Sequence, residues 1–318
     1  MGHSEVMTAL PLLRTETYAV MHRWRTELSL IVRDASVTAV TQLLQNEVLR
    51  METAVSRFRP DSELSIANRQ PGRWQTVSWY FVEVLEAALD AARSTDGIVD
   101  PCLAHLVDAA GYRTWRNAEG TPLQPMEPQR QPPSDDGAWS WRDIEIRPAG
   151  SHALVRVPPG LALDLGAVAK GWLADRVAVR AVAGFGRDAI ANMGGDLRAI
   201  AADEPWTVTV DPEQAASGEA ELALWDGALA TSGVGRRAWL TSEGDMAHHI
   251  IDPRTGRSAD TPWWTCSVMA SSAAAANAAS TAGIVLGAQG PEWLSRQGLD
   301  GWFVGGSEER RIGRWPTP

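Results

Sequence analysis

Residues 163–171, LDLGAVAKG, bring together side chains that could bind a phosphorylated ligand. The acid Asp164, Gly166 and the base Lys170 lie within about two helical turns, where an apolar strand is expected to run into a helix. A lysine neutralises phosphate charge, and the first turn of a helix offers backbone N–H groups that have no intrahelical partner. The spacing therefore favours a phosphate site.

Two glycines and an acid follow in NMGGD, residues 192–196. Gly194 and Gly195 would allow the backbone to approach a ligand closely or to turn sharply, and Asp196 adds a carboxylate at the same place. Taken alone, this pattern is more typical of an ordinary tight turn than of a ligand site.

The segment HHIIDPRTG, residues 248–256, predicts a hairpin end. Asp-Pro followed by Thr-Gly is ordinary turn chemistry. If the preceding residues form a strand, His248 and His249 point to opposite sides and do not both face one metal ion. A hairpin end beside a ligand is the more reasonable interpretation.

Asn277 and Thr281 lie four residues apart in the alanine-rich segment 271–283, and hence on one face of a predicted helix. Two side-chain oxygens at this spacing would suit a hard cation such as Mg²⁺. The alternative is a close helix–helix contact through the surrounding alanines, with both polar groups satisfied.

Composition narrows the function classes. The 318 residues carry 29 Lys and Arg against 39 Asp and Glu, a net charge of −10, with no long basic run, so nucleic acid is not an expected partner. The two cysteines form neither a zinc pattern nor a disulfide framework, which indicates a reducing compartment. Residues 1–20 lack the charged and apolar regions of a signal peptide, so we expect a cytoplasmic protein without membrane insertion.

The order of the predicted elements favours an α+β fold with a mixed or antiparallel sheet and flanking helices. Hydrophobic spacing predicts helices over 37–58, 78–94, 167–184 and 272–286. Strands are expected at 27–32, 144–147, 153–157, 189–192, 197–201, 206–210, 222–229, 238–240 and 302–304. Residues 59–68 are expected to form a loop, 1–18 an N-terminal extension, and the Pro- and Gln-rich residues 116–142 a surface excursion.

Seven segments in this order resemble the ApbE-type FAD:protein FMN transferase family. They are RPDSELSIAN (59–68), GIVDP (97–101), LDLGAVAKGWLADR (163–176), NMGGDLRA (192–199), ATSG (230–233), HHIIDPRTGR (248–257) and ANAASTA (276–282). Each motif is modest alone, but their shared order over residues 59–287 makes a chance match implausible.

The resemblance implies one α+β domain of two lobes, spanning residues 1–318, with FAD in the cleft. In that family FMN moves from FAD to a threonine of an acceptor flavoprotein, AMP is released, and Mg²⁺ bridges the pyrophosphate. Lys170 and Asn277 become the candidate catalytic residues, and the metal would bind the main-chain oxygen of Ala167 and the side chains of Asn277 and Thr281. FAD would contact Met21, Ile98, Val99, Asp100, Asp164, Lys170 and Ile251, and Gly194, Gly195 and Asp196 would shape the nucleotide pocket.

The chain departs from the family pattern at the expected metal site. The aspartate of the family's A-D-A-L-S-T-A is Asn277 here, which brings an oxygen but no charge and cannot act as a base. Val99 replaces the usual aromatic residue, and Cys102 stands where threonine is common. Three hypotheses remain: the flavin transferase, an FAD pyrophosphatase in which water replaces the threonine, and a flavin-binding paralogue that has lost its metal.

Overall fold

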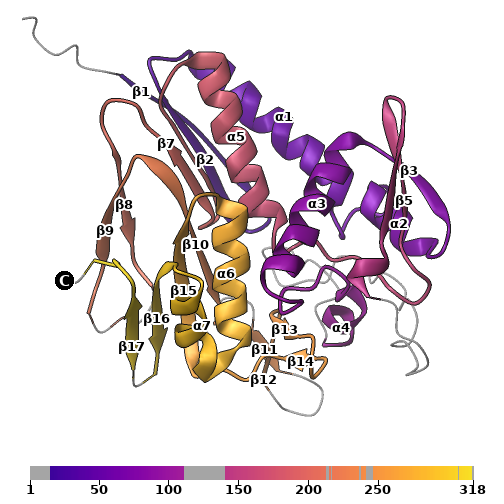
Figure 1. The fold of residues 1–318 in the computed structure, drawn as a ribbon. Coiled ribbons are helices and arrows are strands. Elements are labelled where there is room, and N and C mark those ends of the chain that lie inside the picture. Colours follow the sequence, from indigo (N-terminus) through magenta and orange to yellow (C-terminus); the bar gives the residue numbers. More distant parts are fainter. Residues whose placement is uncertain are drawn as a thin grey trace, which may run out of the picture.

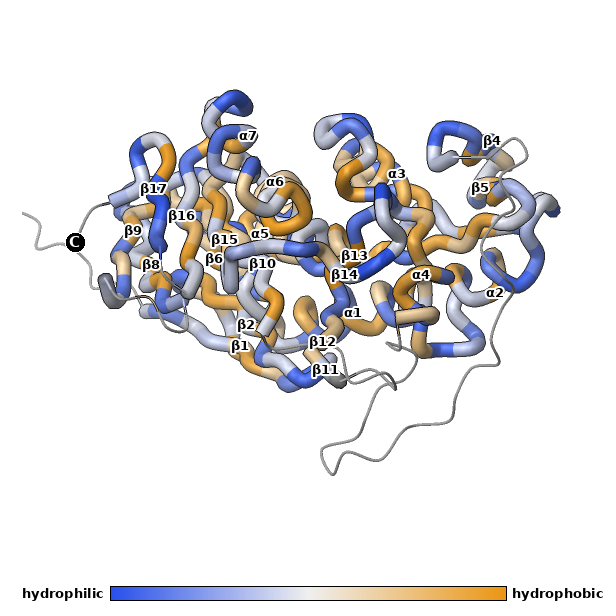
Figure 2. Tube along the Cα trace, turned by 90° about the horizontal axis from the view of Figure 1, so that it is seen from below, coloured by the Kyte–Doolittle hydropathy of each residue, from blue (hydrophilic) through white to orange (hydrophobic). Residues whose placement is uncertain are grey.

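The structure is a computed structural model that describes residues 15–110, 140–212, 215, 217–235, 238–240, 246–306 and 308–316. Figure 1 shows two parts side by side: a large sheet covered by helices, and a smaller part built from α2, α3, α4 and three short strands. Hydrophobic stretches run through the middle of both parts, and hydrophilic stretches lie on the outer turns (Figure 2). None of the helices in the described residues is both long enough and apolar enough to cross a lipid bilayer.

The large sheet has eight strands in the order β1-β2-β6-β7-β10-β15-β16-β17, and every neighbouring pair is antiparallel. The strands are β1 (Glu16–Arg23), β2 (Thr26–Arg33), β6 (Ala189–Met193), β7 (Leu197–Ile200), β10 (Asp226–Gly233), β15 (Trp263–Ala270), β16 (Asp300–Gly305) and β17 (Glu309–Ile312). β2 pairs with β6, so segments far apart in the chain become neighbours.

Helices cover one face of this sheet. α1 (Val37–Val55) packs on β1 and β2, α5 (Ala169–Phe185) on β6 and β7, and α6 (Ala273–Val285) on β10 and β15. α5 and α6 lie against each other, and α7 (Gly290–Arg296) follows α6 (Figure 1). A hairpin of β8 (Trp206–Val210) and β9 (Ala220–Leu224) shares a second apolar cluster with the sheet.

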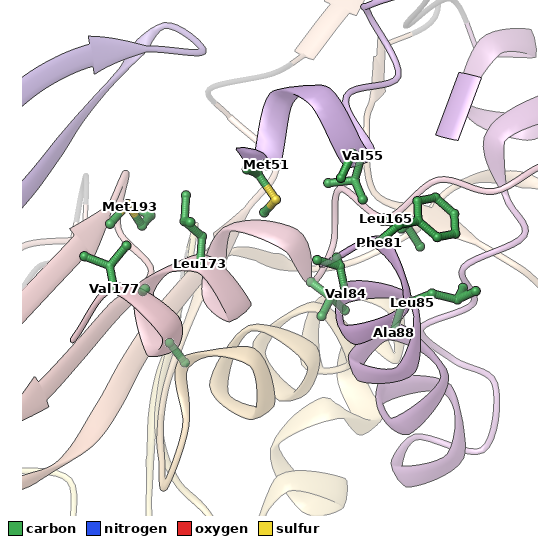
Figure 3. Close-up of a cluster of buried hydrophobic side chains, with 14 of the residues drawn as sticks. Met51, Val55, Phe81, Val84, Leu85, Ala88, Leu165, Leu173, Val177 and Met193 are labelled. Atoms are coloured by element: carbon green, nitrogen blue, oxygen red, sulfur yellow. The ribbon is translucent and has the colours of Figure 1, made fainter. Parts of the chain in front are cut away.

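The smaller part consists of α2 (Glu63–Arg69), α3 (Trp79–Ser94), α4 (Ala104–Ala109) and the three-stranded sheet β3-β5-β4. These strands are β3 (Trp74–Val77), β4 (Glu145–Ala149) and β5 (His152–Arg156), with the short 3-10 helix η1 (Trp141–Asp143) before β4. One apolar cluster continues from this part into the helical layer, where Phe81 and Leu85 of α3 and Leu173 and Val177 of α5 are buried (Figure 3). The two parts therefore share a hydrophobic core.

The remaining strands are short. β11 (Ala238–Leu240) pairs with β12 (Met246–His248), and β13 (Ile251–Asp252) pairs with β14 (Arg257–Ser258). The second pair encloses the predicted Asp-Pro-Arg-Thr-Gly turn, in which Gly256 has a φ of +68°. The hairpin end predicted from the sequence is confirmed.

The α+β class and the four long helices are confirmed, including the cap of α3, where the Ser78 side chain accepts a hydrogen bond from the Phe81 backbone N–H. The loop expected at 59–68 is wrong, because Ser62 caps a short helix, α2, by accepting from the Ser65 N–H. The strand expected at 222–229 is two strands, β9 and β10. The sequence-based assignment also missed several elements, namely β1, β3, β12, β15, β17, α4 and α7.

Two expected surface segments fall mainly outside the described residues. Residues 1–14 of the expected N-terminal extension and 116–139 of the expected excursion are not described. Of the remainder, residues 16–18 already belong to β1, and residues 141–142 belong to η1.

Candidate active site

A cavity of about 680 Å³ lies where the two parts meet, within the size range of pockets that bind small molecules. Its walls come from the end of α1, the segment before α4, the turn before α5, the β6–β7 turn, the end of β10, the β12–β13 connection and α6. The fold thus brings together the segments that the sequence analysis singled out.

Most of the predicted site residues line this cavity. Those on its wall are Ile98, Val99, Asp100, Asp164, Ala167, Lys170, Gly194, Gly195, Ile251, Asn277 and Thr281. Met21 and Asp196 are not in the lining. Met21 is partly buried on β1 against the main apolar cluster, and Asp196 lies beneath the cavity wall with 1% of its surface exposed.

Asp164 organises the turn that enters α5. Its Oδ1 accepts a hydrogen bond of 2.8 Å from the Gly166 N–H, and its own N–H donates to the Pro101 carbonyl at 2.8 Å. α5 begins at Ala169 and not at 167 as the sequence predicted, so both Asp164 and Ala167 precede the helix. The reason is that the Asp164 side chain closes a local turn, which competes with helix formation. Of the three residues, only Lys170 projects from the helix itself.

Arg57 is a cavity residue that the sequence analysis missed. It follows α1, and its Nη1 donates to Asp164 Oδ2 at 2.7 Å while Nη2 donates to Asp108 of α4. The side chains of Arg57 and Asp164 are each 14% exposed. A guanidinium shared by two carboxylates fixes the position of Asp164 at the cavity wall. The chain separation of 107 residues between Arg57 and Asp164 leaves no local sequence signal for this pair.

Lys170 reaches the cavity above a buried carboxylate. Its Nζ lies 3.3 Å from Asp196 Oδ2, although this oxygen makes no hydrogen bond of good geometry within the described part of the chain. The contact is therefore an ion pair that orients the ammonium, and the Lys170 side chain is 22% exposed at the cavity wall. An exposed ammonium of this kind can bind a phosphate oxygen.

The glycine pair before Asp196 forms a tight turn and also lies at the cavity, so it agrees with both interpretations of NMGGD. Gly194 and Gly195 have φ values of +72° and +102°, and the Gly195 N–H donates to Asn192 Oδ1 at 2.8 Å. A Cβ on Gly194 would lie 2.6 Å from the Thr26 side chain. The segment is a tight turn, and it also lines the cavity, so a ligand could approach its backbone closely.

Asn277 and Thr281 reach the cavity from α6 and are nearly buried, with 7% and 9% exposure. The Asn277 Oδ1 is inaccessible to solvent and has no hydrogen-bond partner among the described residues. An unpaired buried oxygen is costly, and a bound cation would give it a partner. These oxygens and the Ala167 segment therefore fit a divalent cation. No cluster of three or more His, Cys, Asp or Glu able to hold a metal occurs among the described residues.

α6 is fixed to α5 at its N-terminus. The Asp175 carboxylate accepts hydrogen bonds from the backbone N–H groups of Ala273 at 2.7 Å and Ala274 at 3.0 Å. Burial raises the pKa of Asp175, and these hydrogen bonds oppose that shift. A Cβ on Gly171 would lie 2.5 Å from the Ala273 carbonyl oxygen, so only glycine permits this contact between the helices.

The two histidines separate as predicted. The His248 ring hydrogen-bonds the Ala259 carbonyl at 3.0 Å outside the cavity, and burial lowers its pKa. His249 lines the cavity beside Ile251. Asp100 also lines the cavity; burial raises its pKa, and its Oδ1 accepts from the Cys102 N–H at 2.7 Å. His249 is therefore a further functional candidate, to which the sequence analysis assigned no role.

Comparison with known proteins decides the family, because the sequence profile of the ApbE family matches residues 24–303. The chain belongs to the ApbE family. A protein of Treponema pallidum named FAD:protein FMN transferase is 30% identical over 85% of this chain and 77% of its own length. A Haemophilus influenzae protein of the same name is 27% identical over 80% of this chain and 75% of its length.

Solved structures support the ApbE fold. The ApbE protein of Thermotoga maritima superposes with a TM-score of 0.76 at 24% identity, covering 94% of this chain and 97% of the other. The apo flavinyl transferase ApbE of Pseudomonas stutzeri gives a TM-score of 0.77 at 19% identity, covering 95% and 96%. The family and fold predicted from the seven motifs are confirmed.

Proposed function

We propose that this ApbE-family chain is an enzyme that transfers FMN from FAD to a threonine hydroxyl of an acceptor flavoprotein and releases AMP. The names of the relatives from Treponema pallidum and Haemophilus influenzae support this reaction. The observation that carries the proposal is the single cavity that unites Lys170 with Asn277 and Thr281. A cation-binding half and a phosphate-binding half facing one space are what a pyrophosphate substrate requires.

The reaction is a phosphoryl-type transfer. The threonine oxygen forms a bond to the phosphorus that carries the flavin, the bridging P–O bond breaks, and its electron pair leaves with AMP. The hydroxyl proton passes to a base or to water. Catalysis of such a transfer depends mainly on positioning and on stabilising negative charge.

Lys170 would bind a pyrophosphate oxygen, since its ammonium is held at the cavity wall by Asp196. Mg²⁺, held by the Ala167 main-chain oxygen, Asn277 and Thr281, would supply the remaining charge neutralisation. Asp164, fixed by Arg57, would orient the nucleotide. The flavin-binding wall would comprise Ile98, Val99, Asp100, Ile251 and the Gly194–Gly195 turn.

Asn277 favours one second candidate, a flavin-binding paralogue with little transfer activity. In this chain the proposed cation would meet an amide oxygen, a hydroxyl and a carbonyl, none of which is charged. Fewer charged ligands lower the affinity for a divalent cation. Purified protein that binds FAD but transfers no flavin at saturating Mg²⁺ would support this alternative.

The test is incubation of the protein with FAD, Mg²⁺ and an acceptor flavoprotein domain, followed by mass spectrometry. The expected product is the acceptor with one FMN joined through a phosphoester to its threonine. An acceptor in which that threonine is replaced by alanine is the matched control. Release of AMP and FMN without an acceptor adduct would instead assign the chain as an FAD pyrophosphatase.

A further inference from the structure

Thr281 belongs to a chain of nearly buried hydroxyl groups, of which Ser232 also lines the cavity. Ser232 of β10 places its Oγ 2.9 Å from Thr281 Oγ1 and 2.8 Å from Ser280 Oγ. The Ser280 Oγ in turn lies 3.0 Å from the backbone carbonyl oxygen of Asn277. Ser280 is fully buried and Ser232 is 9% exposed, so water does not compete strongly for these bonds.

The donor-to-acceptor order along these hydroxyl groups is limited by the single proton that each of them carries. A carbonyl only accepts, so the Ser280 hydroxyl donates to the Asn277 carbonyl. Ser280 therefore accepts from Ser232, whose proton is then used. If every contact in this chain is to hold one proton, Ser232 accepts from Thr281, and the Thr281 proton points toward Ser232.

The opposite direction leaves one contact unexplained. If Ser280 donated to Ser232, and Ser232 to Thr281, the Ser280 oxygen would face the Asn277 carbonyl oxygen at 3.0 Å with no proton between them. Two buried acceptors in contact lose a hydrogen bond and repel each other. The Thr281 proton would be free to point into the cavity only where Ser232 donates to Thr281, and every such order leaves one contact of Ser280 without a proton.

We propose that Ser232 and Ser280 are positioning residues that make Thr281 a lone-pair donor toward the cavity, and so a ligand for a divalent cation rather than a hydrogen-bond donor to phosphate. The proposal rests on the metal site of the proposed function. The fixed orientation of the hydroxyl dipoles also explains how a site without a charged ligand can favour a cation, since the oxygen lone pairs face the cavity before the cation binds.

A second hydroxyl pair provides a matched control. Thr231 of β10 and Ser267 of β15 are paired across the two strands, and Thr231 Oγ1 lies 2.8 Å from Ser267 Oγ. Ser267 is fully buried, like Ser280, but it does not belong to the chain that leads to Thr281. Ser267→Ala removes the same group at the same depth without releasing the Thr281 proton.

The experiment titrates Mn²⁺ as the probe, in the presence of FAD, and follows free Mn²⁺ by electron paramagnetic resonance in the wild type, Ser232→Ala, Ser280→Ala and Ser267→Ala. We expect the dissociation constant to rise about tenfold in Ser232→Ala and Ser280→Ala, the usual effect of losing an outer-shell partner of a metal ligand. Ser267→Ala should bind Mn²⁺ like the wild type. Thermal unfolding of the same four proteins compares the stability cost of each lost hydroxyl.

Unchanged Mn²⁺ affinity in Ser280→Ala would overturn the proposal, even if Ser232→Ala bound Mn²⁺ more weakly than the wild type. Ser280 is the residue that sets the donor-to-acceptor order of the hydroxyl groups. Equal weakening in Ser267→Ala would assign the effect to general destabilisation and would also overturn it. If the wild type binds no Mn²⁺ and transfers no flavin, the proposed function itself fails. If the wild type binds Mn²⁺ and the variants match it, only this inference fails.

Discussion

The Asp175 carboxylate of α5 accepts a hydrogen bond of 2.7 Å from the backbone N–H of Ala273, the first residue of α6. Through this bond the helix that carries Lys170 also fixes the helix that carries Asn277 and Thr281. The two halves of the candidate site therefore share one rigid support, in which helix ends are satisfied by a side chain from the neighbouring helix.

Gly171 permits the close contact between α5 and α6, so Gly171→Ala should displace α6. A Cβ there would lie 2.5 Å from the Ala273 carbonyl oxygen, and we expect a loss of about 1–3 kcal/mol in the free energy of unfolding. Denaturant unfolding measures this loss. Gly184→Ala in the same helix, where a Cβ meets no atom within 4 Å, should be neutral or stabilising by up to about 1 kcal/mol. Equal effects of the two substitutions would contradict the contact.

Lys170→Met should lower the rate of flavin transfer about 100-fold or more, because a preorganised charge at the pyrophosphate is removed. It should also reduce stability by about 1–3 kcal/mol, since Asp196 remains buried without its ion pair. The double variant Lys170→Met/Asp196→Asn should recover stability but not activity. Chemical denaturation and a transfer assay on all three proteins test this, and recovery of activity in the double variant would refute the role of Lys170.

The Asp100 carboxyl should make the free energy of unfolding depend on pH. Burial raises its pKa above the ordinary value of 3.8, so the folded state binds this proton more tightly than the unfolded chain does. The resulting stability is present below pH 3.8 and is lost as the pH rises through the raised pKa, with a limiting slope of about 1.4 kcal/mol per pH unit.

Asp100→Asn should accordingly flatten the fall of stability above pH 3.8, as measured by urea unfolding over a pH series. Asp96→Asn is the control, because the Asp96 side chain is 96% exposed. A pH profile of Asp100→Asn identical to that of the wild type would show that the carboxyl is not perturbed.

Asn277→Asp should tighten the binding of divalent cations several-fold, because it adds a negative charge to a neutral set of oxygens. Without metal, the new buried carboxylate lacks a partner, so the variant should be less stable than the wild type. Added Mg²⁺ should therefore raise its melting temperature more than that of the wild type, by ligand linkage. A melting temperature that does not respond to Mg²⁺ would place the cation elsewhere.

The sequence predicted the parts of the fold whose signals are local. Ser78 as a helix cap and the turn ending at Gly256 depend on neighbouring residues, and both are confirmed. α2 was missed because a seven-residue helix after Pro-Asp-Ser has too few turns to show a periodicity.

The site residues likewise divide into those with a local sequence signal and those without one. Motif order identified Lys170, Asn277 and Thr281 as neighbours, and they share the cavity. The contact of Ser232 with Thr281 joins residues 49 positions apart, so nothing in the local sequence could indicate it. Motifs locate a site along the chain, but the partners that orient its side chains come from the tertiary packing.

The most direct measurement of the central claim is the ratio of AMP released to FMN attached to the acceptor, in one reaction that contains FAD, Mg²⁺ and the acceptor domain. A transferase predicts one AMP for every acceptor threonine that gains FMN, and no AMP above background when the acceptor is omitted. Release of AMP at the same rate with and without the acceptor, with no flavin attached to protein, would contradict the account.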